Sequence, residues 1–178
     1  MGRQEGLHHL LATIDHLVHR QGRRDIQFLC IGDGPERPHL IRLAQDLEIE
    51  DFVSFPGRLP DADMVAVLCA ADLCVNPDGD NEMNRKSTML KIVEYMALGK
   101  AIVQFDLTEG RISAQDAALY ARPNDSVDLA VKITELLADP EARASMGARG
   151  RHRVETELAW DYEAPKLLAA YATLWSQP

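Results

Sequence analysis

Short apolar runs alternate with longer segments of helical periodicity along the chain, and this alternation constrains the fold more than any other feature. We expect strands at five apolar runs, namely 26–31, 52–55, 72–76, 101–105 and 118–120. Apolar residues at helical spacing predict helices over 7–18, 35–47, 59–71, 87–98, 126–138, 140–153 and 160–175. A helix between two consecutive strands lets both strands run in the same direction, and such crossover connections are right-handed. The sequence therefore predicts an α/β fold: a Rossmann-like parallel sheet with helices on both faces.

The size and charge of the chain exclude several classes of protein. Its 178 residues are enough for one domain with its own core. A formal net charge of −9 argues against nucleic acid or an anionic membrane as a partner of the whole surface. No apolar run approaches the ~20 residues of a membrane span, and the polar start lacks the apolar stretch of a signal peptide. We expect a cytoplasmic protein with three buried, reduced cysteines, Cys30, Cys69 and Cys74.

Four loops rich in glycine, aspartate and arginine follow the expected strands. They are 32–34, 57–58, 77–86 and 106–111. Ligands of parallel α/β sheets bind outside the carboxyl ends of the strands, so these loops mark one candidate rim. The segment 77–86 is long for a connection between a strand and a helix, and long connections at such points are usually functional.

The expected helix 87–98 carries the most informative polar residues. Ser87, Lys91 and Glu94 fall on one face of it, and Lys86 and Thr88 stand beside Ser87 at its start. A helix N-terminus with a lysine one turn in is an anion site, and a glutamate beyond it can accept hydrogen bonds from sugar hydroxyls. Phosphate followed by a diol is what a nucleotide presents. The alternative is that Ser87 only caps the helix while Lys91 and Glu94 form an exposed ion pair.

Other motifs exclude more than they support. The Gly32-Asp33-Gly34 turn permits close approach of a ligand to the backbone, or is only a turn. No full Gly-x-Gly-x-x-Gly fingerprint and no P-loop is present, and no Ser/His/Asp arrangement is visible. Asp33, Asp78 and Asp106 follow expected strands, as phosphoacceptors do in receiver domains, but Asp33 lacks the acidic neighbour that a receiver needs. The histidines are expected at the surface or between helices.

Four segments together resemble a known family. They are FLCIGDGP at 28–35, VSFPGRLP at 53–60, ADLCVNP at 71–77 and EYMALGKAIVQFD at 94–106. This series resembles the C-terminal half of retaining glycosyltransferases of the GT-B fold, group 1 or family 4, from about residue 6 to 175. The resemblance implies a single nucleotide-sugar-binding domain over 1–178, without the N-terminal acceptor domain. It also implies that 160–175 is the helix that crosses back toward that domain, with apolar patches exposed around Trp160 and Trp175.

The resemblance also implies roles for residues of the donor site. Glu94 would bind the ribose hydroxyls, and the helix start at Ser87 and Thr88 would meet the diphosphate. The charge of the leaving diphosphate would be neutralised by Lys91, the helix N-terminus and Arg111. The loop of Gly57, Arg58 and Leu59 would lie against the base of the nucleotide. The turn that contains Gly32 and Gly34 would border the same cleft.

The chain departs from the common family pattern at two places. Most members carry two glutamates eight residues apart, but the position eight before Glu94 is Lys86, and Glu82 is out of register. The arrangement Lys-Ser-Thr followed by Lys-Ile-x-Glu-Tyr-Met resembles a subset of the family in which Lys91 would be the phosphate partner. Where members have a lysine before the glycine that opens the first helix, this chain has Glu5 before Gly6.

These observations predict the donor-binding domain of a glycosyltransferase that moves a hexose from a nucleotide-diphosphate sugar to a glycan or lipid-linked acceptor, as in polysaccharide biosynthesis. Lys91 and Glu94 are the expected catalytic residues, with no metal and no cofactor. The expected partners are the nucleotide sugar and the N-terminal domain of the same enzyme, through which a membrane could be contacted peripherally; alone, the chain should be inactive. The alternatives are a non-catalytic nucleotide- or phosphate-binding module, or half of a sugar-nucleotide epimerase.

Overall fold

The computed structural model describes residues 1–175, so the last three residues of the expected domain lie outside the described part. Within it the strands are β1 (Phe28–Ile31), β2 (Val53–Gly57), β3 (Cys74–Asn76), β4 (Ile102–Phe105) and β5 (Ala118–Ala121). All pairs are parallel, as predicted, but hydrogen bonds divide them into β1-β2 and β3-β4-β5 instead of one sheet. Side chains join the two sheets, because Ile26 and Phe28 pack against both of the larger core clusters.

Helices connect the strands along the chain. They are α1 (Leu7–Asp15), α2 (Arg37–Asp46), α3 (Asp61–Ala70), α4 (Glu82–Lys86), α5 (Leu90–Ala97), α6 (Thr108–Ala114), α7 (Ser126–Ala138), α8 (Pro140–Arg153) and α9 (Trp160–Trp175). Shorter helical turns are η1 (Arg3–Glu5), η2 (His16–Arg20), η3 (Glu50–Phe52), η4 (Gln115–Ala117) and η5 (Val154–Leu158). The last three α-helices match their predicted ranges, and their starts are explained by local chemistry. Asp125 and Asp139 accept hydrogen bonds from backbone N–H groups in the first turns of α7 and α8.

Several predicted boundaries were wrong. The helix expected to open at Pro35 begins at Arg37, because Pro35 lies in the preceding turn and Pro38 takes the early helical position. Half of the loop expected at 77–86 is the helix α4, and most of the loop expected at 106–111 belongs to α6.

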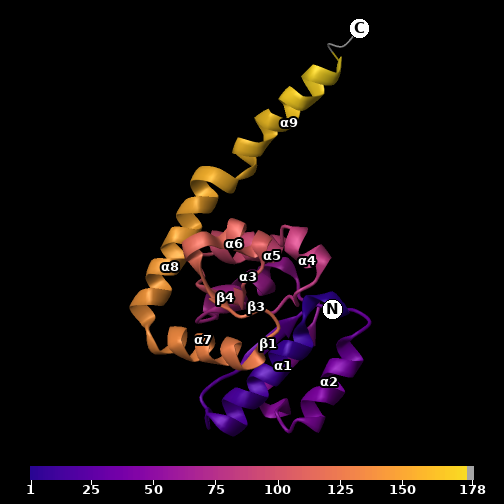
Figure 1. Ribbon diagram of the computed structural model, residues 1–178, viewed down its shortest axis with the longest axis vertical. Coiled ribbons are helices and arrows are strands. Elements are labelled where there is room, and N and C mark those ends of the chain that lie inside the picture. The colour runs from indigo at the N-terminus through magenta and orange to yellow at the C-terminus, as the bar shows by residue number, and fades with distance from the viewer. Residues whose placement is uncertain (176–178) are drawn as a thin grey trace.

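Strand β4 lies at the centre of the packing, with helices on both of its faces. Val103 and Phe105 point into a cluster with residues of α7, whereas Ile102 packs with residues of α5 and α6. The other main cluster joins α1 and α2 to β1 and β2. Figure 1 shows the strands between α4, α5 and α6 on one side and α7 with α1 on the other. The predicted two-sided covering by helices is therefore confirmed.

Helix α3 contains no buried residue, although apolar residues make up most of its sequence. Met64, Val67 and Leu68, which recur at helical spacing, are half-buried, whereas Val65 lies outside this face and is exposed. Cys69 of α3 is accordingly exposed, which corrects the expectation of three buried thiols. Cys30 and Cys74 are buried as expected, and burial raises the pKa of each thiol to about 12.

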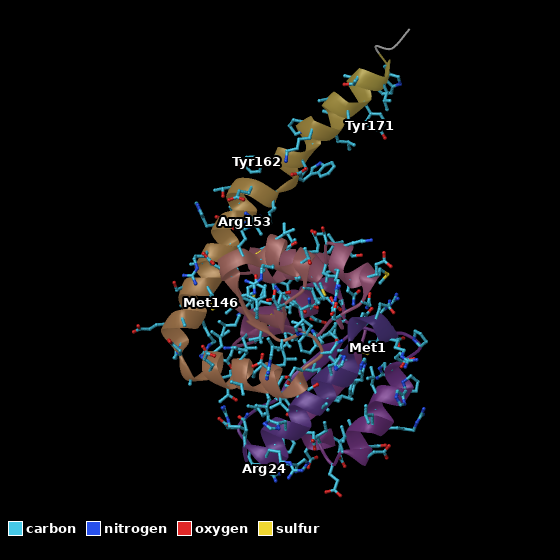
Figure 2. All side chains as sticks on the ribbon, in the orientation of Figure 1. Met1, Arg24, Met146, Arg153, Tyr162 and Tyr171 are labelled. Carbon is cyan, nitrogen blue, oxygen red and sulfur yellow. The ribbon has the colours of Figure 1, made fainter. Side chains whose placement is uncertain are left out.

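Helix α9 leaves the body of the domain after α8 and extends away from it (Figure 1). None of its residues is buried, and Trp160 and Trp175 are 66% and 81% exposed, as expected. Figure 2 shows Tyr162 and Tyr171 on this helix, clear of the core. No helix within residues 1–175 combines the length and the apolar character needed to cross a membrane.

Candidate functional site

A cleft of about 400 Å³ lies beyond the carboxyl end of β3, on the rim where the sequence places the site. Its walls come from η1, from the segment after β3, from α4 and from the start of α5. The lining residues are Gln4, Glu5, Asp78, Met83, Asn84, Ser87, Met89, Leu90 and Lys91. Two of the predicted site residues, Ser87 and Lys91, are therefore brought together here.

An ion pair between Asp78 and Lys91 lies in the wall of this cleft. The Lys91 ammonium donates a hydrogen bond to Asp78 Oδ1 at 2.7 Å. The Asp78 side chain is only 2% exposed and that of Lys91 is 29% exposed. The second carboxylate oxygen, Asp78 Oδ2, is buried without a hydrogen-bond partner among the described residues. Lys91 thus pairs with Asp78, and the alternative of an exposed pair between Lys91 and Glu94 is wrong.

Asn84 joins three parts of the cleft wall. Its Nδ2 donates hydrogen bonds of 2.8 Å to the carbonyl oxygens of Gln4 and Gly79, while its backbone N–H donates to Asn81 Oδ1. This side chain is 2% exposed, and its Oδ1 is a second buried oxygen without a partner in the described part of the chain. Both unpartnered atoms in the wall are therefore hydrogen-bond acceptors.

The start of α5 differs from the prediction in a way that changes the site. The helix begins at Leu90, and residues 87–89 are not helical. The Ser87 hydroxyl donates to the carbonyl oxygen of Met83 in the first turn of α4, and the Thr88 hydroxyl donates to Glu109 of α6 at 2.6 Å. Residues 87–89 thus separate α4 from α5, and the Thr88 hydroxyl is bound to α6. The expectation that Ser87 lies on one helix face with Lys91 and Glu94 is wrong, and the N-terminus of α5 carries no side-chain cap.

Glu94 and Lys86 lie outside the lining of the cleft. Glu94 is exposed on α5, one turn beyond Lys91. Lys86 donates a hydrogen bond to Glu82 at 2.7 Å, and both side chains are largely exposed. The two residues at or near the position of the first family glutamate are thus paired with each other on the surface of α4.

The predicted glycine positions form a neighbouring part of the rim. The Gly32 N–H donates to the Gly57 carbonyl oxygen at 2.8 Å, so the turn after β1 and the end of β2 lie together, as expected. A Cβ on Gly34 would overlap the backbone of Met1, whose ammonium donates to the Asp33 carbonyl oxygen. Met1, labelled in Figure 2, thus occupies the space beside this turn. The link that follows Gly57 contains Arg58, which is exposed, and Leu59, which is half-buried.

Arg111 is held at a third place on the rim. Its guanidinium donates hydrogen bonds to both oxygens of Asp106, at 2.7 and 2.6 Å, and lies 4.0 Å from the centre of the Tyr120 ring. The hydrogen bond from Arg111 lowers the pKa of Asp106, and burial raises the pKa of Tyr120 to about 12. The charge of Arg111 is therefore already paired, and this residue does not line the cleft.

Sequence reasoning missed the parts that Gln4, Glu5, Asp78 and Asn84 play in the cleft wall. A usable signal was present for α4, because an asparagine that caps a helix accepts from an N–H three residues later, as Asn81 does from Asn84. Across residues 1–175, no three His, Cys, Asp or Glu side chains are grouped so that they could hold a metal ion.

Comparison with known proteins adds independent findings. The sequence profile of the family described as Glycosyl transferases group 1 matches residues 1–139. A GDP-mannose-dependent monoacylated alpha-(1-6)-phosphatidylinositol monomannoside mannosyltransferase of Corynebacterium glutamicum is 33% identical over 148 residues, which cover 82% of this chain and 38% of the relative. The 2-deoxystreptamine glucosyltransferase of Streptomyces kanamyceticus is 25% identical over 176 residues, or 96% and 43% of the two chains. The chain thus spans about two fifths of the length of these relatives.

Solved structures share the fold. The sucrose-phosphate synthase of Thermosynechococcus elongatus superimposes with a TM-score of 0.85 at 24% identity, over 99% of this chain and 44% of that chain. The Anabaena protein Alr3699/HepE, solved in complex with UDP, gives a TM-score of 0.83 at 18% identity, over 97% and 46% of the two chains.

Proposed function

Because the chain belongs to the group 1 glycosyl transferases and has the Rossmann-like α/β fold of one GT-B half, we propose that it is the donor-binding domain of such an enzyme. The whole enzyme would transfer a hexose from a nucleotide-diphosphate sugar to a glycan or lipid-linked acceptor. The observation that carries this proposal is the cleft beyond β3, where a lysine and an uncapped helix N-terminus meet.

The diphosphate of the donor would lie against the start of α5. The first N–H groups of an α-helix have no partner within the helix, and the helix dipole favours negative charge there. No side chain caps α5, and Lys91 in its first turn has two further N–H hydrogens besides the one given to Asp78. Ser87 and Thr88 precede this helix as hydroxyl-bearing residues of the same rim. This arrangement supports a site for phosphate oxygens.

The nucleoside would lie beyond the phosphates. Glu94 is exposed one turn further along α5, where its carboxylate could accept hydrogen bonds from a ribose diol. Gly57, Arg58 and Leu59 would face the base, with Gly32 and Gly34 beside them at the turn that contacts Gly57. Lys86 and Arg111, which are paired with Glu82 and Asp106, would contribute only to the charge of the rim.

Catalysis in this half would consist of holding the donor and stabilising the charge that develops on the leaving diphosphate. Lys91 and Glu94 are the proposed residues for these tasks. No covalent nucleophile, metal ion or cofactor enters the proposal.

The acceptor would be bound by an N-terminal domain of the same enzyme, and peripheral contact with a membrane would be made through that half. Helix α9, which has no buried residue, would pack against it. The chain alone should then bind a donor without transferring sugar. A cytoplasmic location completes the proposal, since Cys30 and Cys74 are buried free thiols and free thiols persist in a reducing compartment.

The names of the relatives support a nucleotide-diphosphate donor. The mannosyltransferase of Corynebacterium glutamicum is described as GDP-mannose-dependent, and the Anabaena structure contains UDP. The two alternatives left open by the sequence, a non-catalytic module and half of an epimerase, are not favoured, because the matching family consists of glycosyl transferases.

Calorimetric titration of the chain with UDP, GDP and ADP tests the proposal. We expect binding of at least one of the three, weaker at high salt, because phosphate is recognised partly through charge. A chain that binds none of them, while folded by circular dichroism, would contradict the proposed function.

A further inference from the structure

We infer that Asp78 binds hydroxyl groups of the donor sugar, through the carboxylate oxygen that Lys91 leaves free. This inference rests on the proposed function and assigns to one residue the recognition of the sugar. Asp78 directly follows Pro77 at the end of β3, in the wall of the cleft that also holds Lys91 and the start of α5.

The first argument is that the two oxygens of the Asp78 carboxylate differ in their hydrogen bonds. Asp78 Oδ1 accepts a hydrogen bond from Lys91, whereas Oδ2 is buried and has no partner in the described part of the chain. Leaving a buried charged acceptor unpaired is costly, and such sites persist where a ligand or another group completes them. Asp80, two residues further along, shows the ordinary solution, because Arg85 donates to both of its oxygens.

The second argument is the kind of atom that the cleft leaves unsatisfied. Asn84 Oδ1, in the same wall, is also buried without a partner in residues 1–175. Both atoms can only accept hydrogen bonds, so their ligand must bring hydrogens. Ionised phosphate oxygens bring none and would be repelled by the Asp78 carboxylate. Hydroxyl groups of a sugar bring several, which makes a polyhydroxylated group the fitting occupant.

The third argument concerns position and space. Lys91 touches Asp78, and the proposed phosphate site is the first turn of α5, which contains Lys91. A sugar linked to the second phosphate would therefore lie next to Lys91 and Asp78. The cleft volume of about 400 Å³ is within the range of small-ligand sites, ~300–1,000 Å³. Asp78 is itself one of the residues that line this cleft.

The competing explanation is that the pair of Asp78 and Lys91 only fixes α5 to the segment after β3. The two explanations differ in what the sugar contributes to affinity. If Asp78 holds the sugar, the substitution Asp78→Asn should remove affinity for sugar nucleotides and leave affinity for nucleoside diphosphates intact or improved. If Asp78 is only structural, both affinities should fall together.

The experiment is calorimetric titration with UDP, UDP-glucose, UDP-N-acetylglucosamine, GDP and GDP-mannose. The quantity compared is the ratio of the dissociation constant of the diphosphate to that of its sugar derivative. We expect Asp78→Asn to reduce this ratio about tenfold or more for the preferred donor, the effect of losing a hydrogen bond to a charged group. Asp80→Asn is the matched control, since it changes the same residue type in the same segment, and it should leave the ratio unchanged.

A second variant keeps the inference falsifiable if Asp78→Asn does not fold. Lys91→Gln retains a hydrogen-bond donor toward Asp78 and should weaken all ligands while preserving the ratio. Each of three results would overturn the inference: a reduced ratio in Lys91→Gln, an unchanged ratio in folded Asp78→Asn, or a wild-type ratio of one for every donor. In each of these cases, binding of a nucleoside diphosphate would still uphold the proposed function. Absence of binding by all five ligands would overturn both.

Discussion

Gly6 and Pro77 lie so close together that a Cβ on Gly6 would overlap the Pro77 carbonyl oxygen. Gly6 opens α1 with a φ of +63°, and Pro77 opens the segment that carries Asp78 into the cleft. The contact therefore seats η1 against the segment after β3, and the hydrogen bond from Asn84 to Gln4 holds the same two parts together.

The substitution Gly6→Ala should destabilise the fold by about 2 kcal/mol or more, the combined effect of a strained left-handed φ and overpacking. Gly22→Ala is the matched control, because Gly22 has a φ of +69° but nothing within 4 Å of a Cβ. Urea unfolding of both variants measures the difference. Equal losses of unfolding free energy would show that the contact with Pro77 does not constrain the fold.

Lys91→Ala should weaken binding of the preferred nucleoside diphosphate by about tenfold or more, because a charged hydrogen bond to phosphate is lost. The defect should shrink in salt. Lys132→Ala is the control, since Lys132 is 28% exposed and paired with Glu135, much as Lys91 is 29% exposed and paired with Asp78. Calorimetry at low and high salt checks this, and the prediction fails if both variants behave alike.

Glu94→Gln should weaken ribonucleotides and leave inorganic pyrophosphate unaffected, because Glu94 is proposed to meet the ribose and not the phosphates. The measurement compares a nucleoside diphosphate with its 2′-deoxy form. The wild type should prefer the ribose form, and Glu94→Gln should lose that preference. A preference that survives the substitution would remove Glu94 from the proposed site.

Removal of residues 160–178 should leave the unfolding free energy close to that of the full chain, because no residue of α9 is buried. The exposed apolar side chains of α9 should promote self-association of the intact chain at high concentration. Sedimentation velocity of both forms tests this. A monomeric intact chain, or a shortened chain that unfolds far more easily, would count against the described role of α9.

The stability of the fold should fall as the pH drops below about 6.5, partly through His9. Burial, and then the charge of His8, lowers the pKa of His9 in the folded chain. The unfolded chain therefore binds more protons between the two pKa values, and acid favours it. Urea midpoints at pH 7.5 and 5.5 should differ more for the wild type than for His9→Gln. An identical pH dependence would contradict the assignment.

The fold was largely predictable because its signals are local. The apolar run at β4 and the capping residues Asp125 and Asp139 can be read from neighbouring residues, and α7 and α8 follow from them. Helix α3 was less predictable in its burial, since an apolar sequence states what a helix can bury but not whether a neighbour covers it.

The site was only partly predictable because its bonds join distant residues. Thr88 donates to Glu109, 21 positions away, and residue 88 lies outside the helix that the spacing alone predicts. Lys91 pairs with Asp78, 13 positions away, and the intervening loop and α4 bring the two residues together. Helical spacing placed Lys91 beside Glu94 instead, which is the nearest partner that periodicity can identify.

The small helix α4 can accept substitutions at the edge of the cleft with little effect on the core. It has five residues, and only Asn84 among them is buried. Met83 is the only one of the other four residues that lines the cleft. A substitution there can therefore reshape the outer lip while the core, the strands and the bonds made by Asn84 stay as they are. Ligand selectivity at this rim can thus change between relatives at little cost in folding stability. Asn84 is the residue of α4 that cannot be replaced without such a cost.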